Sequence, residues 1–247
     1  GRVWINMYEC IRKTNLFLEN IHLTPLSDEF TQKDKDRWIG EATLLRALYH
    51  FFCLRIYGPI PIMDYAAKTD DDFTQIKRKP LDECIQFILD ECDRAIPMLD
   101  VRITDNQKYG RMTAAAAYAI KARLLLYRAS PLFNGNPDYV GFKDNDGVLL
   151  FPQEKDPQRW AIAAEACKKC IDECENAGFA LYRSSDNDPV KNITGLYLER
   201  NNQEVILARN CGVEGVVEKC CFPRSNGGWA GWNPTQNLVD AYEMANG

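Results

Sequence analysis

Apolar positions recur every three or four residues through much of this chain, which is the period of an amphipathic helix. The strongest pattern runs over residues 36–57 and ends at Gly58-Pro59, because glycine tolerates a left-handed cap and proline cannot continue the helical hydrogen bonds. The same spacing predicts further helices over residues 3–21, 80–99, 113–129, 157–177 and 234–244. Residues 205–208 form a short strand candidate, and residues 195–204 fit no single element.

The predicted helices follow one another as antiparallel pairs of unequal length. This order is typical of an irregular helical repeat, in which each pair buries its apolar face by stacking on the next pair. A loop rich in Asn, Asp, Gly and Pro interrupts the series over residues 131–157. We therefore expect a mainly all-α fold with long loops and little strand.

Composition and charge exclude several classes of protein. The chain has 247 residues, of which 46% are hydrophobic and 26% charged, as in ordinary globular proteins. The formal net charge is -5, and no basic run is present that would bind nucleic acid. No apolar run is long enough to cross a bilayer as a helix. The two histidines, His22 and His50, lie in segments with a structural pattern, which weakens the case for acid–base catalysis.

Ten cysteines are too few for a disulfide scaffold in a chain of this length. Most of them fall on the apolar faces of predicted helices, so we expect mainly buried thiols. Cys167, Cys170 and Cys174 have a spacing that can bind metal, but no second Cys or His pair of matching spacing completes a four-ligand site. The sequence therefore predicts neither a metal site nor a cofactor.

The remaining motif searches indicate no catalytic machinery. Residues 144–147, Asp-Asn-Asp-Gly, resemble the start of a calcium loop, but the first and twelfth ligand positions would be Phe142 and Gln153, so an Asx-type turn fits better. The chain contains no glycine-rich phosphate loop and no Gly-x-Ser-x-Gly nucleophile elbow. We therefore expect no enzyme activity and assign no catalytic residue.

Residues 222–232 are the strongest candidate for a ligand-binding segment. The segment is too rich in glycine for a helix, yet it contains Trp229 and Trp232 beside Arg224 and Asn226. A tryptophan in a polar loop exposes a large apolar ring, and such rings often form binding platforms. The alternative is that both rings fold back onto the helices as anchors.

Several stretches of the chain, taken in order, form a specific set of motifs. They are Trp4 with Asn15-Leu16-Phe17-Leu18; Gly40-Glu41-Ala42 with Leu45-Arg46-Ala47; Tyr57-Gly58-Pro59-Ile60-Pro61; residues 114–135 with Trp160; and Pro234-Thr235-Gln236-Asn237-Leu238-Val239-Asp240-Ala241-Tyr242. Over essentially the whole chain, this set resembles the SusD/RagB family of outer-membrane nutrient-binding lipoproteins of the Bacteroidetes. The resemblance implies tetratricopeptide-like helix pairs with irregular loops on the ligand face.

The resemblance also implies a function and partners. Family members are lipid-anchored at the cell surface and cap a SusC-like TonB-dependent transporter, into which they help load glycans or, in some branches, peptides. No signal peptide or lipobox is present, and members continue through a large C-terminal part. We therefore expect residues 1–247 to be one SusD-like domain that is incomplete at both ends, with its lipid anchor outside this chain.

Few ligand contacts can be transferred from the family, because its sites are shallow, lined by aromatic residues and variable. Trp229, Trp232, Arg224 and Asn226 suit the stacking and hydrogen bonding that sugars need. Weaker candidates after the Gly-Pro-x-Pro exit are Tyr65, Asp71 and Asp72. Glu41 and Arg46 are expected to form a polar pair within their helix.

Three alternatives remain open at this point. The chain can be a peptide-binding member of the same family, an intracellular helical-repeat scaffold for a protein partner, or a metal or iron–sulfur enzyme. A lipobox at the true N-terminus favours a surface protein over a scaffold, and a stoichiometric metal in the purified protein favours the enzyme.

Overall fold

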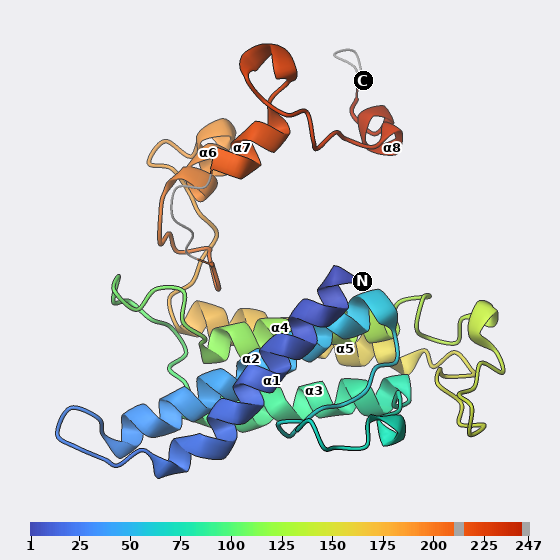
Figure 1. Ribbon diagram of the computed structural model, residues 1–247. Coiled ribbons are helices and arrows are strands. Elements are labelled where there is room, and N and C mark those ends of the chain that lie inside the picture. Colours follow the sequence, from blue (N-terminus) through green and yellow to red (C-terminus); the bar gives the residue numbers. More distant parts are fainter. Residues whose placement is uncertain (210–214, 244–247) are drawn as a thin grey trace. The chain divides into compact units, whose positions relative to one another are not determined.

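The computed structural model describes residues 1–209 and 215–243, which fall into two compact units, Gly1–Ala208 and Arg209–Gly247 (Figure 1). The expectation of one domain over the whole chain stays a prediction. Among the described residues, the first unit contains six α-helices and the second two short ones. Their bounds are α1 Arg2–Asn20, α2 Gln32–Tyr57, α3 Leu81–Ala95, α4 Ala114–Ala129, α5 Gln158–Asn176, α6 Pro189–Leu198, α7 Gly215–Cys221 and α8 Gln236–Asp240.

Local sequence signals define where the long helices begin and end. Thr31 and Asp34 form a capping box at the start of α2, and Gly58 ends the helix at a positive φ of 69°. Thr113 caps α4 by accepting a hydrogen bond from the Ala116 N–H at 3.2 Å. The Thr31 and Thr113 side chains thus satisfy N–H groups at the helix starts that would otherwise have no partner.

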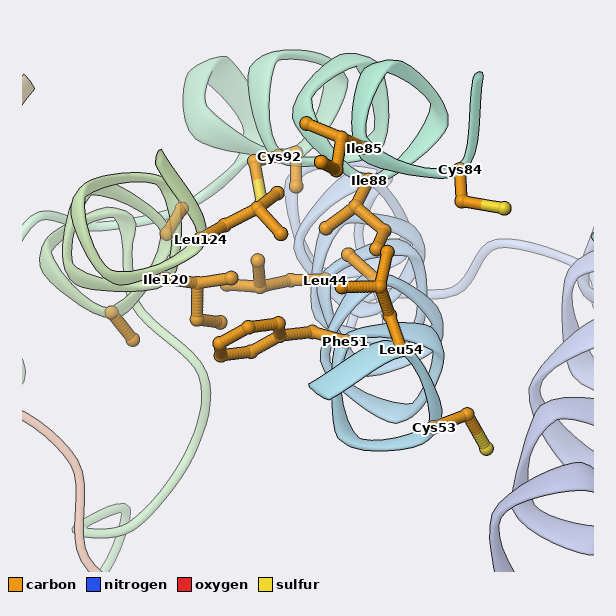
Figure 2. Close-up of a cluster of buried hydrophobic side chains, with 14 of the residues drawn as sticks. Leu44, Phe51, Cys53, Leu54, Cys84, Ile85, Ile88, Cys92, Ile120 and Leu124 are labelled. Atoms are coloured by element: carbon orange, nitrogen blue, oxygen red, sulfur yellow. The ribbon is translucent and has the colours of Figure 1, made fainter. Parts of the chain in front are cut away.

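The first five helices pack in sequence order, α1 on α2, α2 on α3, α3 on α4 and α4 on α5 (Figure 1). The main core lies where α2, α3 and α4 meet, and Figure 2 shows Leu44, Phe51, Ile88, Ile120 and Leu124 pointing toward one another there. A second cluster joins α4 to α5 through residues that include Ala115, Ala122, Cys170 and Cys174. The small alanine side chains of α4 allow its neighbours to approach closely.

The structure confirms the all-α fold class and the five long helices. The strand predicted at residues 205–208 is wrong: this segment is irregular, and the described residues contain only an isolated bridge between Lys143 and Leu149. Ile206 instead packs as a partly buried side chain against both core clusters. Residues 195–198 of the ambiguous region form the end of α6, a helix that Asp188 caps. The last helix is shorter than predicted, and Met244 lies outside the described residues.

The predicted pairing of Glu41 with Arg46 is wrong. The two residues are five positions apart on α2, so their side chains leave different faces of the helix. Glu41 pairs with Arg111, with Oε2 and Nη2 2.5 Å apart, whereas Arg46 pairs with Glu91 of α3, with Nε and Oε2 2.7 Å apart. Each partner therefore comes from a different segment of the fold.

The cysteines and the predicted turn at residues 144–147 behave largely as the sequence predicts. Nine cysteines lie in the described residues without forming a disulfide there, and the five that are buried are Cys53, Cys84, Cys92, Cys170 and Cys174. Cys211 lies outside the described residues. Asp144 forms the expected Asx-type turn, since its Oδ1 accepts from the Asp146 and Val148 N–H groups.

Residues 1–209 and 215–243 hold no group of three or more His, Cys, Asp or Glu side chains placed to bind a metal ion. Within the same ranges, every helix is too short or too polar to cross a bilayer.

Candidate functional site

A cleft of about 650 Å³ lies in the first unit between α1 and the loop that follows α2. This volume is within the range of small-molecule binding sites. One face of α1 forms one wall, and the loop forms the other. The lining residues are Trp4, Tyr8, Ile11, Arg12, Asn15, Pro61, Met63, Tyr65, Ala67, Lys68, Thr69, Phe73 and Ile76.

Aromatic rings make up much of the cleft wall. The ring of Trp4 packs against Tyr8 at a centroid distance of 4.6 Å and meets Tyr57 edge-on at 5.1 Å. Tyr8 also donates its hydroxyl to the Pro61 carbonyl at 2.7 Å, and burial raises the pKa of this phenol. Tyr65 and Phe73 on the loop remain 43% and 55% exposed. The helix thus holds fixed rings, and the loop offers two accessible ones.

Buried polar side chains hold the loop against the helices. Asn15 of α1 donates from Nδ2 to the Met63 and Tyr65 carbonyls at 3.0 and 2.7 Å. Arg46 of α2 donates from Nη1 to Asn15 Oδ1 at 2.8 Å and to the Asp64 carbonyl at 2.9 Å. Because the loop has no sheet partner, these side chains satisfy main-chain groups that burial would otherwise leave unpaired.

The buried charge of Arg46 is balanced inside the same network. Its Nε donates to Glu91 Oε2 at 2.7 Å, and the other oxygen of Glu91 pairs with Arg94 at 2.6 Å. Arg46 and Glu91 are 5% and 4% exposed. The pair therefore joins α2 to α3 directly behind the cleft loop.

His50 completes the network as a neutral side chain. Its Nδ1 donates to the Arg46 carbonyl at 2.8 Å, and its Nε2 accepts from the Met63 N–H at 3.2 Å, which together assign the Nδ1-protonated tautomer. Burial, assisted by the nearby charge of Arg46, lowers the pKa of His50 to about 4. His50 therefore has a structural role, as expected, because it connects α2 to the main chain of the cleft loop.

Three of the predicted site residues belong to the cleft loop. Tyr65 lines the cleft, whereas Asp71 and Asp72 are absent from its lining. Asp71 Oδ2 accepts from the Lys68 N–H at 2.8 Å, and Asp72 caps the short 3-10 helix Phe73–Gln75. Hydrogen bonds from Thr74 lower the pKa of Asp72. Both carboxylates thus hold turns that position the neighbouring lining residues.

The other four predicted residues lie in the second unit, in the segment after α7. Trp229 and Trp232 are 52% and 58% exposed, so neither ring is buried as a loop anchor within the described residues. The Lys219 ammonium lies 5.5 Å from the centre of the Trp229 ring, a cation–π contact.

Main-chain hydrogen bonds hold the tryptophan segment against α7. Trp229 N donates to the Lys219 carbonyl at 2.5 Å, and Trp232 N donates to the Cys220 carbonyl at 3.1 Å. The turn requires glycine at position 228, because a Cβ there would lie 2.0 Å from the Phe222 carbonyl oxygen. The two exposed rings are thus carried by a backbone with defined partners.

The polar residues of this segment are also exposed. Arg224 and Asn226 form the 3-10 helix Arg224–Asn226, and Asn226 Oδ1 accepts from the Ser225 hydroxyl at 3.4 Å. Arg224 forms no ion pair with any residue in the described ranges. The seven predicted residues therefore fall into two groups, three in the first unit and four in the second.

Sequence reasoning missed the contribution of α1 to a concave surface. Trp4 and Tyr8 fit the helical period of the predicted helix, yet both are only half-buried and line the cleft. The sequence did contain a signal for this surface. Arg12 and Asn15 are polar and lie on the same helix face as Trp4 and Tyr8, whereas a face that is fully buried in a core would be apolar.

Comparison with known proteins gives consistent matches to one group. A family model of SusD-like proteins, described as starch-binding associating with outer membrane, matches residues 1–126. A SusD-like protein of Bacteroides ovatus is 26% identical over 98% of this chain and 40% of its own length.

Solved structures agree with this match. A SusD-like protein from Bacteroides fragilis superposes with a TM-score of 0.72 at 25% identity, covering 98% of this chain and 41% of that one. A protein named surface glycan-binding protein A, from Bacteroides uniformis, shares the fold with a TM-score of 0.58 at 17% identity, over 86% of this chain and 38% of its own. The chain thus spans about 40% of the length of these three relatives.

Proposed function

Because this chain belongs to the SusD-like family, we propose that the protein binds oligosaccharides at the cell surface and does not cleave them. The observation that carries this proposal is the pair of tryptophans, Trp229 and Trp232, each more than half exposed on a segment with defined backbone partners. Tryptophan rings are enriched at binding interfaces, because they offer a large apolar face together with a polar N–H group.

The chemistry of these residues suits carbohydrate. The C–H faces of sugar rings pack on flat aromatic surfaces, and the hydroxyl groups take hydrogen bonds from side chains such as Arg224 and Asn226. Tyr65, with Asp71 and Asp72 shaping its loop, offers a second aromatic contact in the first unit. We propose that Trp229, Trp232, Arg224 and Asn226 in the second unit and Tyr65 in the first contact ligand, and that Asp71 and Asp72 act through the turns they hold.

The family also supports a role in uptake. We propose that the protein is a lipid-anchored outer-membrane protein that delivers its ligand to a SusC-like TonB-dependent transporter. We expect such a transporter to co-purify with the intact protein, and we expect the transporter gene to lie beside the gene for this protein.

Calorimetry with oligosaccharides identified on a glycan array tests the binding function. Trp229→Ala and Trp232→Ala are expected to weaken binding roughly fivefold each, because each removes about 1 kcal/mol of aromatic contact. Trp160→Ala serves as the matched control, since Trp160 is also a half-exposed tryptophan but lies on α5.

Two results would contradict the glycan function. One is an array without any bound glycan, combined with unchanged growth of both variants on every polysaccharide tested. The other is equal weakening by the Trp160 control. Peptides are then the next ligand class to test, as the family's other branch.

A further inference from the structure

The lining of the cleft in the first unit is charged with one sign only. It contains Arg12 and Lys68 and no carboxylate. Neither cation forms an ion pair with any residue of the described ranges, although Lys13, next to Arg12, pairs with Glu9 at 2.9 Å. Two cations that face an open cleft without a carboxylate partner can bind an anionic ligand.

The two cations lie at the same place on the cleft rim. Arg12 Nε donates to the Ala67 carbonyl at 3.1 Å, so the guanidinium lies beside the peptide bond that leads into Lys68. This hydrogen bond leaves both Nη groups of Arg12 free to donate to a ligand oxygen. Lys68 is exposed, and its side chain has no partner among the described residues.

Three carboxylates on or beside this loop, Glu19, Asp71 and Asp72, accept hydrogen bonds from its main chain. Glu19 Oε1 accepts from the Ala66 N–H at 2.6 Å, and Asp71 Oδ2 accepts from the Lys68 N–H at 2.8 Å. Asp72 accepts from Thr74 N at 3.0 Å. Each of the three thus has a hydrogen-bond donor on the loop, and none of them forms an ion pair with Arg12 or Lys68.

The rest of the lining suits a sugar ring. Trp4 is held by two aromatic neighbours, and Tyr65 and Phe73 present accessible rings from the loop. Such rings pack against the C–H face of a pyranose, while a negative substituent on the same sugar reaches the cations.

We propose that this cleft binds an acidic oligosaccharide, with a sugar ring against the aromatic wall and its carboxylate or sulfate between Arg12 and Lys68. The inference rests on the proposed glycan-binding function and gives it a ligand class. A planar guanidinium and a flexible ammonium can each donate hydrogen bonds to a carboxylate or a sulfate, so the shared requirement is the negative charge.

The test uses the intact protein and three oligosaccharide probes of equal length: a uronic-acid oligomer, a sulfated oligomer and a neutral one. Calorimetry is expected to give tighter binding of at least one acidic probe than of the neutral probe, with a loss of affinity as ionic strength rises. The uronic and sulfated arms decide which anion the cleft prefers.

Substitutions of the two cations test whether the acidic probe binds in the cleft. Lys68→Gln and Arg12→Gln are each expected to weaken the acidic probe roughly tenfold, because a hydrogen bond to a charged group is lost. Binding of the neutral probe is expected to stay unchanged in both variants. Lys33→Gln is the matched control, since Lys33 is also an exposed lysine without an ion pair in the described residues but lies at the start of α2.

A labelling experiment gives an independent readout of the same site. The acidic probe is expected to protect Lys68, and not Lys33, from an amine-reactive reagent. Protection of Lys68 without any ligand would mean that another part of the intact protein fills the cleft, which would overturn the inference.

The remaining outcomes separate this inference from the proposed function. If acidic and neutral probes bind equally, or if Lys68→Gln weakens binding no more than Lys33→Gln, the acidic preference of the cleft is refuted while glycan binding stands. If no oligosaccharide binds at all, the proposed function fails and the inference fails with it.

Discussion

Lowering the pH from about 7 to about 5 is expected to destabilise the helical unit around His50. Both ring nitrogens are engaged, with Nδ1 donating to the Arg46 carbonyl and Nε2 accepting from the Met63 N–H. Protonation at Nε2 would turn that acceptor into a donor that faces another donor, and it would place a second buried cation beside Arg46. The folded protein therefore resists protonation, which is why the pKa of His50 falls to about 4.

The sign and size of the effect follow from proton linkage. In the unfolded chain a histidine has a pKa of about 6.5, so below that pH the unfolded state binds a proton that the folded state excludes. The stability contributed by His50 is complete above pH 6.5 and is lost as the pH falls toward 4. At pH 5 the loss is about 2 kcal/mol, and its limit is about 3 kcal/mol.

Denaturant unfolding at a series of pH values measures this loss. The wild-type free energy of unfolding is expected to fall by about 2 kcal/mol between pH 7 and pH 5. His50→Gln is expected to lower stability at pH 7 and to remove most of the dependence over this interval. His22→Gln is the control, because it removes the other histidine and keeps His50.

Two results would refute the reasoning. One is an NMR titration in which the His50 ring protonates near pH 6.5 while the protein stays folded. The other is a His50→Gln variant whose stability changes with pH as steeply as that of the wild type. Exchange of the Met63 amide proton gives a local check, since opening of its hydrogen bond to His50 must become easier at lower pH.

Two further substitutions test the packing behind the cleft. Glu91→Ala leaves the Arg46 guanidinium buried without its carboxylate. It is expected to lower the free energy of unfolding by about 3–5 kcal/mol, measured as a lower denaturant midpoint. A loss below about 1 kcal/mol would show that water or Asn15 compensates fully for the missing carboxylate. Leu124→Ala opens a cavity between α2, α3 and α4 and is expected to cost about 2–5 kcal/mol, with Leu126→Ala, on the exposed side of α4, costing far less. Equal losses for the two leucines would contradict the observed core.

The helices were predictable because their signals are local. The apolar period, the Thr113 cap and the glycine after α2 each act within a few residues, so they can be identified in the sequence alone. The partners of Glu41 and Arg46 were not predictable in this way. Arg111 lies 70 positions after Glu41, and Glu91 lies 45 positions after Arg46. A periodic pattern within one helix carries no information about partners so distant in the sequence.

The candidate site was predictable only in part, for a related reason. A hydrophobic period identifies the apolar face of α1 but does not tell whether another segment covers that face completely. Trp4 and Tyr8 therefore fitted a core equally well. In contrast, Trp229 and Trp232 stood out because an apolar ring in a glycine-rich segment conflicts with its surroundings, and their exposure agrees with that signal.

Side chains of α1 and α2 hold the cleft loop by its main chain, and this has a consequence for how the protein can evolve. Asn15, Arg46, His50, Glu19 and Arg12 all contact backbone N–H or carbonyl groups of residues 63–67. Such main-chain contacts do not depend on which side chains the loop carries. Residues such as Tyr65, Lys68 and Thr69 are therefore free to be exchanged while the loop keeps its path. A single scaffold can acquire a new ligand preference through substitutions in one short segment, without rebuilding the helices that support it.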